Sequence, residues 1–154
     1  MEQPTSSNQA GELAVRDLYV QLLGSWNQRD AHSMAGLFSE KGHVVGFDGS
    51  VVNGRKEIEA HIGQVFEDHV TASYIGIVRE VRFITEEVAI LRAVAGMVPP
   101  GGKEINAAVN TIQTLLASRQ DNRWEIELYQ NTPAQFHGRP DLSAALTHEL
   151  QQLV

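Results

Sequence analysis

His61 is the residue whose type and position best suit proton transfer. It falls between Ile58 and Val65 on the apolar stripe of a predicted helix, so its imidazole is expected to face the interior. A core histidine that is hydrogen-bonded to a neighbour is the simpler interpretation. The functional interpretation is a general acid–base, or a polar anchor at the mouth of a cavity, because imidazole can give or take a proton near neutral pH.

Four polar side chains interrupt segments that otherwise alternate like β-strands: Arg79, Arg92, Gln113 and Gln130. The predicted strand pairing places them among Val, Ile and Leu, where a polar group needs a partner and an unpaired Arg is costly. They could line a cavity in which water or a ligand satisfies them, or lie near a sheet edge and reach solvent. Both interpretations stay open for the glutamines. For the arginines the solvent-exposed interpretation is favoured, because a shift of the strand register by one residue would turn them outward.

Large aromatic residues near the same elements are candidates for the walls of such a cavity. Trp26, Phe47 and Phe66 are expected in the core, and core aromatics near the open end of a domain also line its pocket. Asp48 directly follows a predicted strand and could act as a base at the rim. Its neighbours Gly49 and Ser50 make a turn aspartate the simpler interpretation.

Motifs for metal, nucleotide or nucleophilic chemistry are absent from the sequence. Glu57 and His61 lie four apart, but two ligands do not make a zinc site, and there is no His-Glu-x-x-His pattern. The stretch 101–104 has Glu104 where a phosphate loop needs Ser or Thr. The dinucleotide pattern Gly-x-Gly-x-x-Gly and the nucleophile elbow Gly-x-Ser-x-Gly are also missing. We therefore expect no metal site and no nucleotide or flavin cofactor.

The charge balance argues against two classes of partner. Twelve basic and nineteen acidic residues give a net charge of −7, which disfavours nucleic acid and anionic membrane surfaces. No apolar run is long enough to span a bilayer, and the first residues lack a signal-peptide pattern. The absence of cysteine suits a reducing compartment. A cytoplasmic protein is expected.

The elements that must position these residues follow from periodicity. Helical spacing predicts a helix over 12–27, a short one capped by Asp30, and a third one capped by Asn53. A short strand is expected before the third helix, and a last helix after Asp141. Between them, alternating segments joined by turns predict an antiparallel meander. The predicted strands cover residues 43–47, 74–84, 88–98, 105–118 and 124–132.

These elements predict one α+β domain: N-terminal helices packed on a curved antiparallel meander, with an extra C-terminal helix. The boundaries are a flexible leader at 1–11, the domain at 12–133, and a C-terminal loop and helix at 134–154. Pairing the strands through their turns places a large apolar set under the helices: Ile75, Ile77, Val81, Phe83, Val88, Ile90, Val94, Val109, Leu115, Trp124, Ile126 and Leu128. The opposite face then carries a small apolar set, which predicts a homodimer surface. That set is Ala89, Leu91, Ala93, Ala95, Ala108, Ile112, Leu116 and Tyr129.

The order of elements resembles the cone-shaped fold of the nuclear transport factor two-like superfamily, which includes ketosteroid isomerase and SnoaL-type polyketide cyclases. Several strings resemble its SgcJ/EcaC branch more closely, above all SWNQRD at 25–30, NGRKEI at 53–58 and QNTP at 130–133. The resemblance covers roughly residues 12–140. It implies a role in natural-product biosynthesis, with a polyene or aromatic polyketide as guest. The isomerase's aspartate base does not carry over, because Phe47, or at best Asp48, stands in its place.

The leading functional hypothesis is a homodimer that binds an apolar or aromatic small molecule, with acid–base chemistry at His61 that needs no cofactor. Cyclisation, dehydration or isomerisation of an enediyne-type or other polyketide would be its enzymatic form. One alternative is a binding or chaperone protein without chemistry, and another is a structural dimerisation module. The candidate ligand-binding residues are Trp26, Phe47, Phe66, Arg92, Gln113, Gln130 and Asn131.

Overall fold

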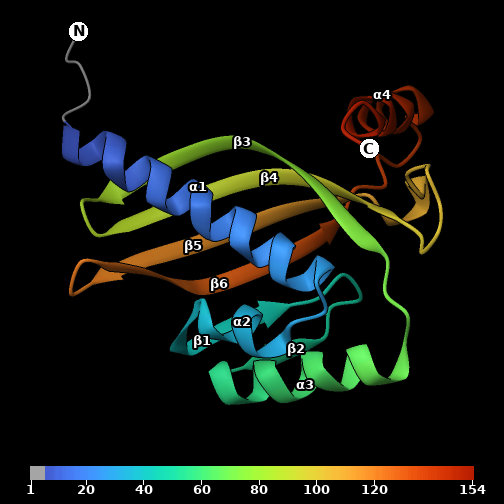
Figure 1. Cartoon of the computed structure of the whole chain (residues 1–154). Coiled ribbons are helices and arrows are strands. Elements are labelled where there is room, and N and C mark those ends of the chain that lie inside the picture. Colours follow the sequence, from blue (N-terminus) through green and yellow to red (C-terminus); the bar gives the residue numbers. More distant parts are fainter. Residues whose placement is uncertain (1–5) are drawn as a thin grey trace, which may run out of the picture.

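The computed structural model describes residues 6–154 and confirms the predicted α+β architecture, with N-terminal helices, one sheet and a C-terminal helix (Figure 1). Of the predicted leader, residues 1–5 lie outside the described residues, and residues 6–11 form the first turns of α1. The elements in chain order are α1 (Ser6–Asn27), α2 (Ala31–Gly36), β1 (Phe38–Val45), β2 (Val51–Asn53), α3 (Arg55–Asp68), β3 (Ser73–Thr85), β4 (Val88–Val98), η1 (Ala107–Val109), β5 (Thr111–Gln120), β6 (Arg123–Pro133) and α4 (Pro140–Gln151).

Six strands form one sheet in the order β2-β1-β6-β5-β4-β3. Strands β3 to β6 are the predicted antiparallel meander, but β1 pairs with β6 in parallel, so the sheet is mixed. Strand β2, which pairs with β1, has only three residues and was not predicted. The strand expected over 105–118 begins at Thr111, because η1 and its flanking residues take the preceding stretch.

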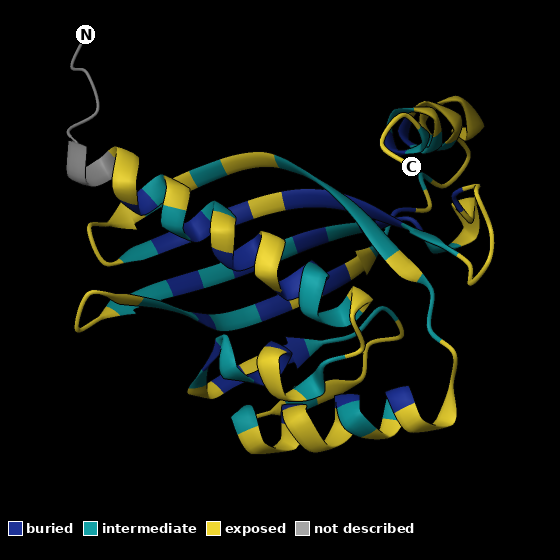
Figure 2. Cartoon of the chain, viewed as in Figure 1, coloured by how far each residue is buried: buried dark blue, intermediate teal, exposed yellow. Residues whose placement is uncertain are grey.

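Helices α1 to α3 lie on one face of the sheet, where the main core is buried. Figure 2 shows α1 buried along the side that faces the strands and exposed on the other. The strand residues beneath it are small, among them Ala89 and Ala93. Gly76 is the closest point: a Cβ there would lie 2.6 Å from Leu23 Cδ1 and would also collide with the Tyr19 hydroxyl. The small side chains therefore make room for the large ones of α1.

The predicted faces of the sheet are reversed in part. The helix-covered core does include five residues predicted there: Val81, Phe83, Leu115, Trp124 and Ile126. The Ala-rich set that was expected to form a dimer surface contains Leu91, Ala93 and Tyr129, and these lie buried under the helices. Conversely, Ile75, Ile77 and Val94 belong to a second apolar cluster with the C-terminal helix. The prediction was wrong for these residues because it assumed regular alternation along β3 and β6, and because it placed Leu91 and Leu115 on opposite faces although they pair.

Three irregularities in the ladders account for the reversals along β3 and β6, whereas β4 and β5 pair without a shift. The register shifts between Val78 and Glu80 and between Phe83 and Thr85 in the β3–β4 pair, and a further shift lies at Leu116/Ala117 in the β5–β6 pair. Each bulge adds one residue to one strand, and one residue turns every following side chain to the other face. As a result Phe83 pairs with Ala89 rather than with Ile90.

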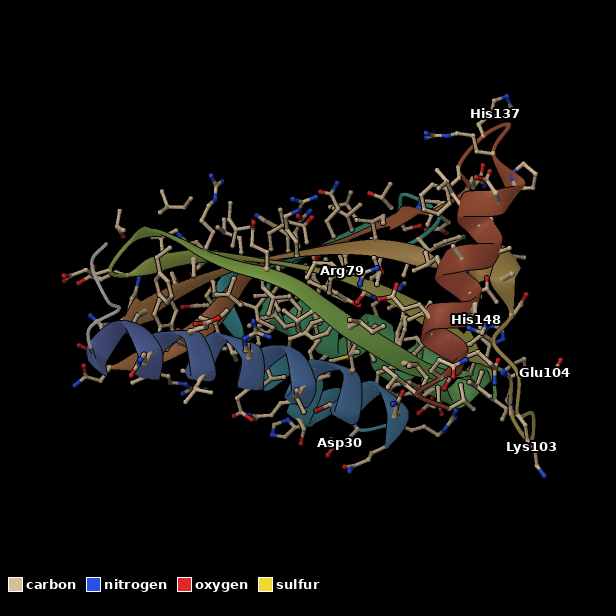
Figure 3. The ribbon with its side chains drawn as sticks, turned by 90° about the horizontal axis from the view of Figure 1, so that it is seen from above. Asp30, Arg79, Lys103, Glu104, His137 and His148 are labelled. Atoms are coloured by element: carbon tan, nitrogen blue, oxygen red, sulfur yellow. The ribbon has the colours of Figure 1, made fainter. Side chains whose placement is uncertain are left out.

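Helix α4 packs on its own domain, on the side of the sheet away from α1 (Figure 3). Leu146 and Leu150 pack against Val94, and Gly96 leaves space for Leu150. Arg79 of β3 donates two hydrogen bonds to the Glu149 carboxylate, at 2.5 and 2.6 Å. Between residues 6 and 154 no helix is both long and apolar enough to cross a membrane.

Hydrogen bonds hold the first turns of α2 and α3, the two helices that border the site. Asp30 caps α2 as predicted, since its carboxylate accepts a hydrogen bond from Ser33 N at 3.0 Å. The cap position of α3 is Gly54 rather than the predicted Asn53. Arg55 holds the start of α3 to the sheet, because its guanidinium donates to the Phe38 carbonyl at 2.8 Å and to Glu125 at 3.0 Å.

Candidate functional site

A cavity of about 450 Å³ opens between the end of α1, helices α2 and α3, and the sheet. Its walls are mainly apolar and come from elements far apart in the sequence. The size lies within the range of about 300–1,000 Å³ that is usual for small-molecule sites. The lining residues are Trp26, Met34, Val44, Gly46, Phe47, Asp48, Ser50, Val52, His61, Ile62, Val65, Tyr74, Met97, Tyr129 and Asn131.

The buried end of the cavity, which we call the floor, is formed by Tyr74, Tyr129 and Asn131. Burial is the main cause that raises the pKa of both phenols, most strongly for Tyr129, so they stay neutral at ordinary pH. Behind the floor, Gln113 is fully buried and its Nε2 donates to the Tyr129 hydroxyl at 2.7 Å and to Asn131 Oδ1 at 2.9 Å. The Tyr19 hydroxyl donates to Gln113 Oε1 at 2.6 Å.

The open end, which we call the rim, carries Asp48 and His61. Asp48 Oδ1 accepts a hydrogen bond from Ser50 N at 2.9 Å, the geometry of a turn aspartate. This backbone hydrogen bond is the main cause that lowers the pKa of Asp48, the Ser50 hydroxyl adds to it, and His61 makes a smaller contribution. The rim therefore holds a carboxylate and an imidazole close enough to interact, and both are solvent-exposed.

Residues 15–134, more than half of the chain, match the family described as the SnoaL-like domain. The chain belongs to this family. No curated protein matches it. The helices, sheet and cavity described above are thus those of a SnoaL-like domain.

Solved structures agree with this assignment of the fold. A domain of unknown function with a cystatin-like fold from Nostoc punctiforme is 29% identical, with a TM-score of 0.80 over 92% of this chain and 86% of that one. An NTF-2 like protein of unknown function from Shewanella oneidensis is 17% identical, with a TM-score of 0.66 over 79% and 98%. A provisionally named scytalone dehydratase from Novosphingobium aromaticivorans is 13% identical, with a TM-score of 0.71 over 86% and 89%. The nuclear transport factor two-like fold predicted from the sequence is thereby confirmed.

Four candidates from the sequence line the cavity of this SnoaL-like domain: Trp26, Phe47, His61 and Asn131. His61 is exposed at the rim, so it is not a core histidine. Phe66 is buried behind Trp26, with the two ring centroids 5.2 Å apart, and it supports the wall without reaching the cavity. The Trp26 indole is held by its hydrogen bond to the Ala72 carbonyl at 2.9 Å.

Three polar residues that were predicted among the apolar side chains do not line the cavity. Arg79, Arg92 and Gln130 are exposed and lie on the sheet face away from α1. The expected lining role of Arg92 and Gln130 is therefore wrong: Arg92 pairs with Thr114 on the outer face, and the register shift next to Ile126 turns Gln130 to the same face. Gln113 is buried as one interpretation required, but it contacts the floor from behind.

The sequence analysis missed the tyrosines. Tyr129 was assigned to the outer face, and Tyr19 and Tyr74 were not singled out, although all three meet around Gln113 or the cavity. No pattern in the sequence is shared by the three tyrosines, because Tyr19 and Tyr129 stand between large residues and only Tyr74 has a glycine two positions away.

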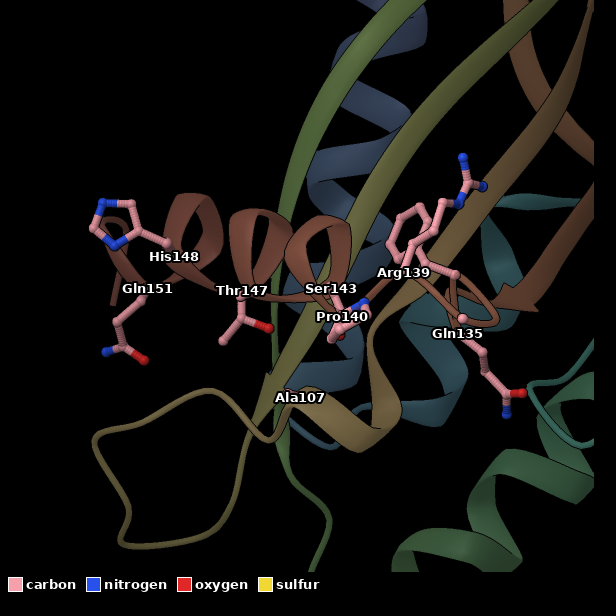
Figure 4. A pocket seen from close by; sticks show the side chains of 11 residues that line it. Ala107, Gln135, Arg139, Pro140, Ser143, Thr147, His148 and Gln151 are labelled. Atoms are coloured by element: carbon pink, nitrogen blue, oxygen red, sulfur yellow. The ribbon is translucent and has the colours of Figure 1, made fainter.

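A second hollow of about 750 Å³ lies beside α4, between this helix, the loop before it and η1 (Figure 4). His148 and Gln135 lie at opposite ends of it, so these polar groups do not converge. Within residues 6–154, no group of three or more His, Asp or Glu side chains is placed to hold a metal ion. The cavity under α1 to α3 is therefore the site where polar groups and enclosed apolar walls coincide.

Proposed function

We propose that this SnoaL-like domain binds an apolar or aromatic small molecule in the cavity between its helices and its sheet. The observation that carries the proposal is the combination of apolar walls with a few polar groups at the floor and the rim. Such walls provide binding energy through burial, and a few polar groups fix the orientation of the ligand.

The rim supports acid–base chemistry on the bound molecule. Asp48 remains a carboxylate at neutral pH, because the backbone N–H of Ser50 stabilises its charge. His61 lies at the same rim as Asp48, and an imidazole can deliver a proton to a ligand atom or remove one. No cofactor is required for a proton transfer of this kind.

The strings that resemble the SgcJ/EcaC branch support a polyketide or enediyne-type intermediate as the guest. Two of these strings border the site: 25–30 contains Trp26, and 130–133 contains Asn131, both of which line the cavity. The reaction that we propose is cyclisation, dehydration or isomerisation, since each proceeds by moving protons around a carbonyl group.

A thermal-shift screen of aromatic polyketides, polyenes and steroids, with nucleotides as negative controls, tests the binding. A ligand at one hundred times its dissociation constant adds roughly 2.7 kcal/mol, which raises the midpoint by several degrees in a domain of this size. Val65→Trp should fill the cavity and remove the shift, whereas Val70→Trp, on an exposed side chain, should keep it. A shift that survives Val65→Trp places the ligand elsewhere, and no shift with any guest rejects the proposal.

Product analysis then separates an enzyme from a binding protein. His61→Ala should abolish conversion of a bound guest while leaving its affinity within a few fold, because the imidazole lies at the rim. His69→Ala is the matched control, since His69 is exposed and does not line the cavity. A guest that is returned unchanged by the wild-type protein would favour the binding or chaperone alternative.

We also propose that the outer face of the sheet joins two copies of the chain. Beyond the area covered by α4, this face carries Ile90, Leu116 and Leu128, which are partly exposed, together with Arg92 and Gln130. Flat apolar surface of this kind is typical of an interface. The helix-covered Ala-rich residues expected from the sequence take no part in it.

A further inference from the structure

Four side chains form a polar network at the floor of the cavity: Tyr129 and Asn131 line it, and Tyr19 and Gln113 lie behind it. The Tyr19 hydroxyl lies 2.6 Å from Gln113 Oε1, and Gln113 Nε2 lies 2.7 Å from the Tyr129 hydroxyl and 2.9 Å from Asn131 Oδ1. The exposed fractions are 2% for Tyr19, 0% for Gln113, 3% for Tyr129 and 7% for Asn131. Water cannot replace these partners, so the direction of each hydrogen bond matters.

The side-chain amide of Asn131 determines which groups donate and which accept in this network. Asn131 Nδ2 faces the Val45 carbonyl at 3.5 Å, and a backbone carbonyl can only accept. The other end of this amide, Oδ1, lies between Gln113 Nε2 and the Thr111 hydroxyl, 3.3 Å away. Gln113 must then present its NH₂ group to Asn131 and its oxygen to Tyr19. The hydroxyl of Tyr19 is the donor that satisfies this oxygen.

This direction leaves a free donor at the floor. The Tyr129 oxygen accepts from Gln113 Nε2, so the Tyr129 proton points away from Gln113. Tyr74 lies beside Tyr129, close enough for the Tyr129 hydroxyl to influence its ionisation. The two phenols carry two protons, and a hydrogen bond between them uses one. At least one proton therefore remains for a group inside the cavity.

Asn131 Oδ1, a side-chain acceptor at the floor, already accepts from Gln113 Nε2 and the Thr111 hydroxyl, and apart from the phenols the other polar side chains with acceptor atoms lie at the rim. Asp48, Ser50 and His61 are exposed at the rim, whereas Tyr129 and Asn131 are buried. Burial raises the pKa of Tyr19, Tyr74 and Tyr129 above the ordinary value of 10.0. The phenols therefore keep their protons at any pH at which the protein is used, and the floor remains a donor.

We infer that the cavity selects ligands with an acceptor oxygen, a ketone, quinone or enolate, which the floor tyrosines bind, and that Tyr19 and Gln113 are positioning residues that hold this donor direction. The inference rests on the proposed function, because it assigns the chemical class of the guest. Among these ligands an enolate would be bound most strongly, since hydrogen bonds to a charged acceptor are stronger than those to a neutral one. The floor thus favours chemistry that builds negative charge on this oxygen.

Two probes that share one ring system test the inference: naphthalene, and 2-acetylnaphthalene, which adds a ketone oxygen. Calorimetry should give 2-acetylnaphthalene an affinity roughly fivefold to tenfold higher, the effect of one net hydrogen bond. The infrared carbonyl stretch of the bound ketone should move to lower frequency than in an apolar solvent. This shift reports hydrogen-bond donation and is insensitive to small changes in stability.

Substitutions identify the residues that donate the hydrogen bond to the ligand and the residue that positions them. The double substitution of Tyr74→Phe and Tyr129→Phe should make the two probes bind equally and return the stretch to its value in apolar solvent. Tyr19→Phe does not alter the cavity lining, but should reduce the preference for the ketone about threefold and weaken the frequency shift. Ile126→Val is the control: this buried residue lies away from the network, and its loss of a methylene should leave the stretch unchanged.

The results of these experiments distinguish a failure of the donor floor from a failure of the proposed ligand site. Equal binding of both probes with an unshifted carbonyl stretch would overturn the donor floor and leave the apolar pocket intact. Failure of both probes to bind rejects the pocket and the inference together. In the ligand-free protein, NMR contacts of the Gln113 amide protons with Tyr129 and Asn131 are expected. Contacts of these protons with the Tyr19 hydroxyl instead would show the opposite direction and overturn the inference.

Discussion

At the residue scale, the same side chain takes different roles according to the face on which it lies. Gln113 is fully buried and bonded to three partners, whereas Gln130 is exposed on the opposite face, although both stand in strands among apolar neighbours. A buried polar group without its partners carries the full free-energy penalty of desolvation, whereas an exposed one carries little of it. The two glutamines therefore form a natural matched pair.

Replacement of Gln113 by Leu should lower the free energy of unfolding by about 2 kcal/mol or more, because it leaves the buried Tyr19 hydroxyl without its acceptor and removes one donor from Tyr129 and from Asn131. Gln130→Leu should change it by less than about 0.5 kcal/mol. Urea denaturation of both variants measures the difference. Equal losses in the two variants would show that the network does not contribute to stability.

Asp48 should titrate below its ordinary pKa of 3.8, chiefly because Ser50 N donates to it. A pKa that is lower in the folded state stabilises the fold above the unfolded value, and this contribution is lost as pH falls through the folded value. NMR titration should show that Ser50→Ala keeps most of the shift, because the backbone N–H remains. An ordinary pKa in Ser50→Ala would assign the shift to the hydroxyl instead.

At the element scale, the close packing of α1 on β3 depends on Gly76, which has no side chain. Gly76 lies under Tyr19 and Leu23, and its missing Cβ lets the helix come close enough for Tyr19 to reach Gln113. The position of α1 thus determines both the packing of the core and the network behind the floor. A change in this contact should affect stability and ligand selection together.

Gly76→Ala should destabilise the fold by about 1–3 kcal/mol, since overpacking forces the helix or the strand to move. Gly24→Ala is the control: a Cβ at this position of α1 would meet nothing within 4 Å. Because Ala favours helix over Gly by about 0.5–1 kcal/mol, this variant should be unchanged or more stable. Thermal unfolding compares the two, and a loss of stability with Gly24→Ala alone would contradict the packing described.

At the scale of the whole molecule, the sheet separates the proposed ligand site from the proposed dimer surface. One face, with α1 to α3, encloses the cavity, and the other carries α4 at one end and a partly exposed apolar surface beside it. Since α4 packs on its own domain, this surface is the part of the sheet left for a second copy. Binding and assembly can therefore be altered independently.

Leu116→Glu should convert the proposed dimer into a monomer, because it places a charge in the middle of the outer face. Sedimentation velocity of the wild-type protein and the variant measures the change, with circular dichroism as the check on folding. Gln28→Glu introduces the same charge at an exposed position near the end of α1 and should leave the dimer intact. A wild-type protein that sediments as a monomer at all concentrations would reject the interface.

The sequence alone determined the element types, the order of helices and strands, the meander and the family fold, because periodicity and turn residues are local signals. It also placed Trp26, Phe47, His61 and Asn131 near one site, since they lie at the ends or on the inner stripes of these elements. Only the tertiary structure decided which face each strand residue occupies. A single bulge reverses a face, and the helical and alternating patterns of the sequence do not mark the bulges next to Glu80, Thr85 and Ala117.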